Sequence, residues 1–161
     1  MEKLPLLGII FMSLPEGILI TLVALELINV RVRLKQLLLI GVLHAFFAYF
    51  VRQYAPNVIF NLLGQASVNL MIAVAITKVK FVPYTIGLAL SYSVYITLES
   101  SIIGILLPAI NQPILEISRN IWMRVLMFSV QVVLFFSIYM LIKRFKLHII
   151  GNTQDSNARR G

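Results

Sequence analysis

The sequence predicts an all-α fold, a polytopic bundle of about five transmembrane helices. Hydrophobic residues occupy 60% of the 161 positions and charged residues only 12%, whereas a soluble domain is about 45–50% apolar and roughly 25% charged. The apolar residues form five long stretches, and a helix needs about 20 such residues to cross a bilayer. Short basic clusters separate these stretches. We therefore expect the excess apolar surface to face lipid.

The first apolar stretch is the least regular. It runs over Leu4–Val30 and contains Pro15, Glu16 and Glu26. Because proline removes a backbone donor and usually kinks a helix, we expect one long kinked helix. The alternative is a short interfacial piece before Pro15, followed by a span. No clear signal-peptide cleavage site is present, so we expect this segment to be retained.

The remaining stretches define the rest of a single transmembrane module over residues 1–146. A turn with Pro56 and Asn57 precedes the third of the five stretches, and only four residues separate the third from the fourth, which implies a tight hairpin. Residues 147–161 are expected to form a polar cytoplasmic tail without fixed structure. The four later spans are Leu34–Val51, Val58–Thr77, Val82–Ile110 and Ile121–Ile142.

Lysine and arginine are distributed unevenly between the two ends of these spans. Ten lie at one end and three at the other, with Arg124 left out as intramembrane. Because short cytoplasmic loops retain positive charge, we expect a multi-pass protein of the cell membrane with its N-terminus outside and its C-terminus in the cytoplasm. The ten are Arg31, Arg33, Lys35, Lys78, Lys80, Lys143, Arg144, Lys146, Arg159 and Arg160.

Polar side chains inside the spans are the first candidates for a functional site. An ionisable group at the centre of a span costs roughly 2.5–3.5 kcal/mol on insertion scales and is therefore retained for a reason. The candidates are Glu16, His44, Asn61, Gln65, Asn69, Glu99 and Arg124.

Glu99 and Arg124 are the most suggestive pair. They lie in the outer halves of the fourth and fifth spans, which are consecutive. They could neutralise each other and fix the register of the two helices. The alternatives are a ligand or ion site, or no mutual contact, with Arg124 extending to the headgroups.

The two carboxylates of the first stretch have simpler interpretations. Ser13 and Glu16 have the spacing of a capping box, which predicts a fresh helix start near water, with Pro15 in its first turn. A proton or cation site at Glu16 is the alternative. Glu26 lies near Arg31 and Arg33, which favours pairing at the membrane interface.

The second and third spans carry neutral polar groups. For His44 a hydrogen bond to another helix is favoured over a ligand or a pH sensor. Asn61, Gln65 and Asn69 recur at four-residue spacing and so share one helical face. That face either joins helices by amide hydrogen bonds or lines a binding cavity.

Several function classes are disfavoured by the inventory of residues. There is no cysteine, no glycine-rich phosphate loop and no HExxH or GxSxG motif, so we expect neither catalysis nor a cofactor. With His44 and His148 as the only histidines, a metal cluster is not expected. The basic residues flank apolar spans instead of forming a solvated face, which argues against nucleic-acid binding.

The order of these features resembles a known family. The segment Leu14-Pro15-Glu16-Gly17, the basic turn at 31–35, the outer turn at 52–56 and the Leu98-Glu99 step look like the N-terminal membrane module of certain Gram-positive sensor histidine kinases. Those kinases join such a module to a cytoplasmic ATPase domain of the GHKL type. The resemblance covers nearly the whole chain, up to about Lys146.

The chain also departs from that family. The phosphorylatable histidine in a cytoplasmic helix pair and the nucleotide-binding domain are not found in it. The resemblance therefore implies an input module that senses a ligand or regulates a signalling partner. A small substrate-binding subunit of a transporter is the main alternative, since it would also place polar residues in the middle of the membrane. The bilayer is the partner that either interpretation requires, and the ligand stays open.

Overall fold

The computed structural model describes residues 6–110 and 121–149, and within them every regular element is an α-helix. This confirms the predicted fold class. Four helices are long and apolar enough to cross a membrane, over residues 34–54, 58–77, 81–105 and 122–145. The helices are α1 (Leu6–Leu27), α2 (Leu34–Tyr54), α3 (Val58–Thr77), α4 (Phe81–Ile110) and α6 (Ile121–Phe145).

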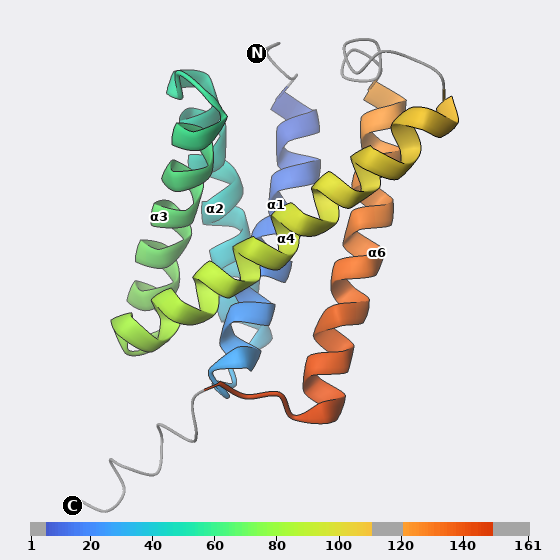
Figure 1. Ribbon diagram of the computed structural model, residues 1–161. Coiled ribbons are helices and arrows are strands. Elements are labelled where there is room, and N and C mark those ends of the chain that lie inside the picture. Colours follow the sequence, from blue (N-terminus) through green and yellow to red (C-terminus); the bar gives the residue numbers. More distant parts are fainter. Residues whose placement is uncertain (1–5, 111–120, 150–161) are drawn as a thin grey trace, which may run out of the picture.

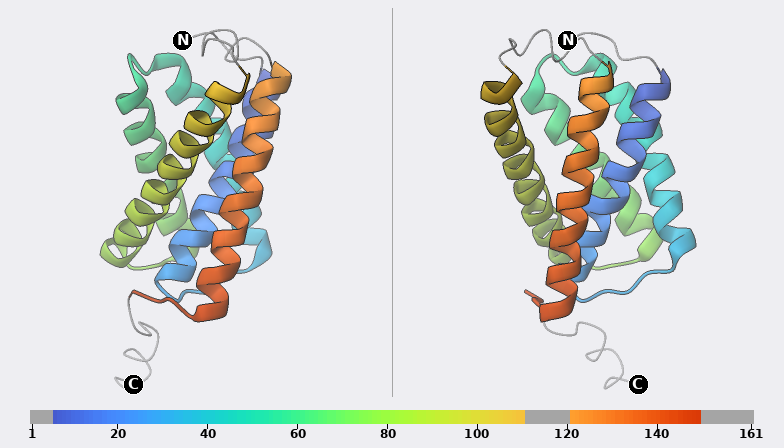
Figure 2. Two further views of the ribbon diagram at one scale, coloured as in Figure 1. Left: turned by 45° about the vertical axis from the view of Figure 1, so that its right-hand side comes forward. Right: turned by 90° about the vertical axis from the view of Figure 1, so that its right-hand side faces the viewer.

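Helix α1 occupies the centre of the bundle. It contacts α2, α3, α4 and α6. Residues 19–28, which end just after α1, supply half of the buried residues in the main apolar core cluster. Figure 1 shows α4 crossing the bundle diagonally, with α2 and α3 on one side and α6 on the other. The start of α1 and the end of α6 lie at opposite ends of the bundle in every view (Figures 1 and 2). The five helices of the described residues run through the bundle in alternating directions, which places these two ends apart.

The helix continues through Pro15 without a break. This confirms a single first helix over the alternative of an interfacial piece followed by a span. It also makes the capping-box prediction wrong, because Ser13 and Glu16 lie well inside α1, where the neighbouring turns already supply the backbone partners that a cap would replace. Both side chains are buried against other helices.

The distribution of polarity is that of a membrane bundle. Large apolar side chains such as Phe46, Met71 and Leu126 are exposed on its outer surface, whereas Thr21 and Asn69 are fully buried. In lipid this arrangement is favourable, since the outer surface needs no water and interior polar groups can bond across helices. The other buried polar residues are Ser13, Glu16, His44, Gln65, Ser91 and Gln131.

Local signals in the sequence set the helix ends. The side chain of Asn57 accepts a hydrogen bond from the Phe60 backbone N–H at 3.0 Å and so caps α3. Asn29 and Lys146 adopt positive φ angles within two residues of the ends of α1 and α6, as left-handed residues do at helix C-termini. Helix α2 extends three residues beyond the predicted Val51. Arg52 therefore lies in its last turn instead of beyond it.

Glycines allow the central helix to approach its neighbours closely. A Cβ atom added at Gly87 of α4 would lie 2.6 Å from the Ala24 carbonyl oxygen of α1. At Gly17 of α1 it would lie 2.5 Å from the His44 ring of α2. Small residues permit such backbone approach in membrane bundles. Gly104, further along α4, has no such neighbour within 4 Å in the part of the chain that the structure describes.

This difference predicts unequal effects of one substitution at two positions of α4. Gly87→Ala should destabilise the bundle by about 1–3 kcal/mol, because a helix backbone cannot move aside as a side chain can. Gly104→Ala should be neutral or stabilising by up to about 1 kcal/mol, through helix propensity alone. Thermal unfolding in detergent, followed by circular dichroism, measures both. Equal melting temperatures for the two variants would contradict the close approach of α1 and α4.

Candidate functional site

The bundle contains an ion pair between its first two helices. The Arg52 guanidinium of α2 donates a hydrogen bond to the Glu16 carboxylate of α1 at 3.0 Å. The Glu16 side chain is 8% exposed and that of Arg52 is 20% exposed. Charges withdrawn from water this far need a partner, because an unpaired charge in an apolar interior is very costly.

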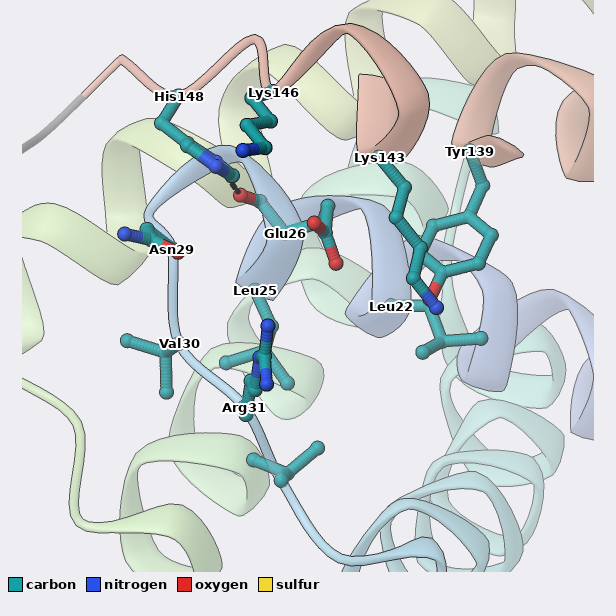
Figure 3. A pocket seen from close by; sticks show the side chains of 11 residues that line it. Leu22, Leu25, Glu26, Asn29, Val30, Arg31, Tyr139, Lys143, Lys146 and His148 are labelled. Carbon is teal, nitrogen blue, oxygen red and sulfur yellow. Dashed lines mark hydrogen bonds between the residues drawn. The ribbon is translucent and has the colours of Figure 1, made fainter. Parts of the chain in front are cut away.

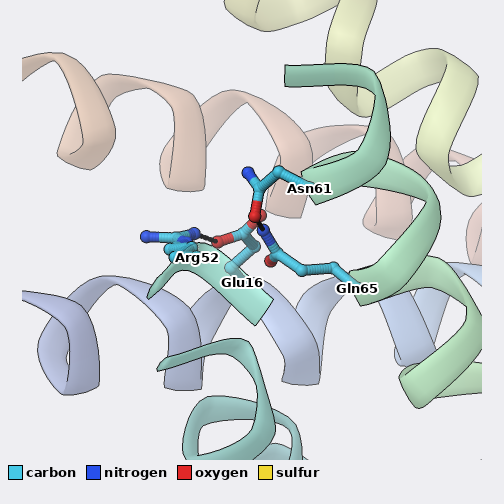
Figure 4. A network of polar contacts seen from close by, with 4 residues as sticks. All are labelled: Glu16, Arg52, Asn61 and Gln65. Atoms are coloured by element: carbon cyan, nitrogen blue, oxygen red, sulfur yellow. Dashed lines mark hydrogen bonds and ion pairs between the residues drawn. The ribbon is translucent and has the colours of Figure 1, made fainter. Parts of the chain in front are cut away.

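Helix α3 brings two amides to this pair. Figure 4 shows Asn61 and Gln65 beside Glu16 and Arg52. The Gln65 amide nitrogen donates to the Asn61 side-chain oxygen at 3.0 Å, across one turn of the helix. The predicted shared face of α3 is therefore confirmed for Asn61 and Gln65, and these two residues lie beside the ion pair.

Helix α4 contributes the remaining side of the cluster. Tyr95 and Glu99 lie close enough to Glu16 to interact with it electrostatically, and Arg52 lies within reach of both carboxylates. We call the six residues from four helices the polar cluster. They are Glu16, Arg52, Asn61, Gln65, Tyr95 and Glu99.

The polar cluster has unused hydrogen-bonding capacity. The Nε atom of Arg52 and the Oε1 atom of Gln65 are buried and have no hydrogen-bond partner among residues 6–110 and 121–149. The same holds for the hydroxyls of Ser13, one turn before Glu16, and of Tyr92. Buried polar groups are normally satisfied. Donors and acceptors left open around an ion pair can instead engage polar groups of a ligand.

A second polar group lies deeper and is fully satisfied. The Asn69 side-chain oxygen of α3 accepts a hydrogen bond from the Tyr84 hydroxyl of α4 at 2.8 Å. The Asn69 amide nitrogen donates to the Thr21 hydroxyl of α1 at 3.1 Å. All three side chains are fully buried. Asn69 thus joins helices, as predicted for this face, whereas Asn61 and Gln65 belong to the polar cluster.

His44 does not make the predicted hydrogen bond to another helix. Its ring is fully buried, and neither ring nitrogen has a hydrogen-bond partner in the described part of the chain. The ring packs instead on Gly17 of α1. A glycine on the facing helix leaves room for a flat side chain but offers no accessible acceptor there, which is why the prediction was wrong.

Two other predicted pairs have different outcomes. Glu99 is exposed on α4 and lies within electrostatic reach of Arg52, while Arg124 is half-buried in the first turn of α6. Their mutual pairing stays a prediction.

Glu26 has no ion-pair partner within 4 Å among the described residues, so its predicted direct pairing with Arg31 or Arg33 is wrong. The chain turns sharply after Glu26, and the carboxylate and Arg31 line one pocket instead.

The sequence signals for the other members of the site were weak. Arg52 was expected just beyond its helix, because hydropathy alone ends the span at Val51. Thr21, Tyr84 and Tyr95 resemble ordinary packing residues, since nothing local distinguishes a tyrosine that bonds across helices. The one available signal was a lone basic residue at the C-terminal end of α2 and a carboxylate in the N-terminal half of α1.

Comparisons with protein-family models, curated protein sequences and solved structures find no match to this chain. The site must therefore be interpreted from its own geometry. The fold of the chain is a helical bundle with apolar helices long enough to cross a bilayer.

The ion pair predicts non-additive stability effects. Glu16→Gln and Arg52→Gln should each destabilise the protein by about 3–5 kcal/mol, because each leaves one buried charge uncompensated. The double variant should lose less than the sum of the two, with a coupling of about 1–3 kcal/mol. Unfolding in mixed micelles gives all three values.

Glu26→Gln is the matched control, since it makes the same substitution in the same helix away from the ion pair. We expect a change within about 0.5 kcal/mol. Additive losses at Glu16 and Arg52, or an equal loss at Glu26, would count against the pair as a structural contact.

The deeper polar group gives an independent prediction. Thr21→Val should destabilise the bundle by about 0.6 kcal/mol, and by no more than about 1.7 kcal/mol, because it removes a hydrogen bond between helices. Thr85→Val is the control, since the Thr85 hydroxyl bonds only its own helix, to the Phe81 carbonyl oxygen at 2.9 Å. The same unfolding assay applies. A larger loss at Thr85 than at Thr21 would refute the role given to Asn69.

Proposed function

We propose that the protein is a sensor-like or regulatory input module of the cell membrane, and that the polar cluster is its input site. The observation that carries this proposal is a buried ion pair, Glu16–Arg52, surrounded by open donors and acceptors from several helices. A polar ligand, or a change in the bilayer, that altered this pair would change how α1, α2, α3 and α4 pack. The proposal includes no catalytic step.

A route from the polar cluster to α6 supports a signalling role. Tyr95 lies near Glu16, and its backbone carbonyl accepts a hydrogen bond from the Gln131 side chain of α6 at 3.4 Å. Its ring meets the Phe135 ring of α6 edge to face, with centroids 5.7 Å apart. A rearrangement around Glu16 would therefore be transmitted to α6 through Tyr95. Such proximity motivates a coupling mechanism, which only measurement can establish.

The proposed orientation places the end of α6 in the cytoplasm. The basic residues that flank the ends of α1 and α3 lie at the same end of the bundle as Lys143 and Arg144 in the last turn of α6. Positive charge of this kind is retained on the cytoplasmic side. A signalling partner would then meet the basic end of α6.

Spin-label distances test the proposal, because the chain has no cysteine. Lys35→Cys and Arg144→Cys place labels at the exposed inner ends of α2 and α6. We expect Arg52→Gln to shift the distance between the labels by about 1–2 Å or more, the size of typical helix shifts in switching proteins. Double electron–electron resonance in nanodiscs measures this distance.

Arg33→Gln is the control, because it makes the same substitution at an exposed site remote from the polar cluster. It should leave the distance unchanged. An unchanged distance in Arg52→Gln would contradict the input role of the polar cluster. Uptake of a compound by proteoliposomes that Arg52→Gln abolishes would favour the transporter alternative over sensing.

A further inference from the structure

A cavity lies at the C-terminal end of α1, away from the polar cluster. Its volume is about 950 Å³. It is bounded by the end of α1, the following loop, the last turns of α6 and the segment that follows α6 (Figure 3). Its lining residues are Leu22, Leu25, Glu26, Asn29, Val30, Arg31, Val32, Tyr139, Lys143, Lys146 and His148.

The charge of this lining is mainly positive. Arg31, Lys143 and Lys146 come from three different segments, and Figure 3 shows them around a single carboxylate, that of Glu26. None of the three cations has a carboxylate within 4 Å among the described residues. The Lys143 ammonium lies over the Tyr139 ring, 5.8 Å from its centroid. Three cations that lie together without a carboxylate within 4 Å in the described residues form a site for an anion.

The cavity lining is also partly apolar. Leu22, Leu25, Val30 and Val32 contribute apolar surface, and α1 carries two of them in its last turns. A site that combines cations with apolar side chains at the end of a membrane bundle suits an amphipathic anion. Basic pockets between membrane helices on the cytoplasmic side bind phospholipid headgroups in this way.

The segment after α6 is held in place as one wall of the cavity. The backbone N–H of Ile149 donates to the Leu27 carbonyl oxygen at 2.8 Å. The Nδ1 atom of His148 donates to the Glu26 carbonyl oxygen at 3.0 Å. These bonds hold the segment after α6 against the end of α1 and keep Lys146 in the cavity lining.

We propose that this cavity binds an anionic phosphate group, which a phospholipid headgroup or a free phosphate could supply. Arg31, Lys143 and Lys146 would neutralise the phosphate oxygens, and the apolar lining residues would contact the first part of a lipid acyl chain. Occupancy would fasten α6 and its following segment to the end of α1. The proposal is independent of any role of the polar cluster.

Lipid titration tests it on the whole chain. Delipidated protein in neutral detergent is titrated with phosphatidylglycerol, and bound lipid is counted by native mass spectrometry. We expect Lys143→Gln/Lys146→Gln to bind about thirtyfold more weakly, at about 1 kcal/mol per basic residue and 1.4 kcal/mol per factor of ten. Arg31→Gln should weaken binding about fivefold and provides a second variant if the double substitution disturbs folding.

Lys78→Gln/Lys80→Gln is the matched control, since it removes two charges from the same end of the bundle, outside the cavity. It should bind like the wild type. Equal weakening of lipid binding in both double variants would overturn the proposal, because it would show unspecific attraction. Phosphatidylcholine binding as tight as that of phosphatidylglycerol would also overturn it, because the cavity would then have no preference for an anion.

Calorimetry with inorganic phosphate distinguishes a lipid headgroup from a free phosphate. Saturable phosphate binding that is lost only in the cavity variants supports a free phosphate. Binding of neither probe overturns the proposal.

Discussion

The ion pair between Glu16 and Arg52 determines how α1 can occupy the centre of the bundle. A carboxylate on the most buried helix needs a partner of opposite charge, and Arg52 at the end of α2 supplies it at 3.0 Å. Because each charge would be costly alone in an apolar interior, the pair fixes the rotation of α1 against α2. Gly17 and Gly41 then let the two helices approach, with His44 and Ile18 packed against them.

The rest of the interior follows from this position of α1. Helices α3 and α4 each present polar side chains to α1. One group is hydrogen-bonded to Thr21 through Asn69, and the other lies around Glu16, where buried polar atoms have no hydrogen-bond partner in the described residues. The side chains of the first group are hydrogen-bonded to one another, whereas the second group has buried donors and acceptors without partners in the described residues. In such a bundle the helices can change their packing around the polar cluster while the hydrogen bonds of Asn69 keep them together. This is the physical basis of the proposed input role.

The sequence predicted the five helices of the described residues and placed their bounds to within three residues, because long apolar runs and flanking charges are local properties. The third span was predicted without error at Val58–Thr77, since a cap and a basic turn delimit it. Contacts between helices were harder to predict. Helical periodicity places Asn61, Gln65 and Asn69 on one face, but it cannot tell which helix that face meets. The capping-box interpretation of Glu16 failed because a local pattern was overruled by a partner 36 residues away.

The central claim is that the Glu16 carboxylate and the Arg52 guanidinium are in contact within lipid. Solid-state NMR on bilayer-embedded protein tests it directly, through the dipolar coupling between ¹³C-labelled glutamate carboxyls and ¹⁵N-labelled arginine guanidinium groups. Glu16→Gln assigns the signal by difference. A strong coupling that this substitution removes is the predicted result, as the 3.0 Å contact requires. Arginine nitrogens that show no coupling to the Glu16 carboxyl would contradict the account.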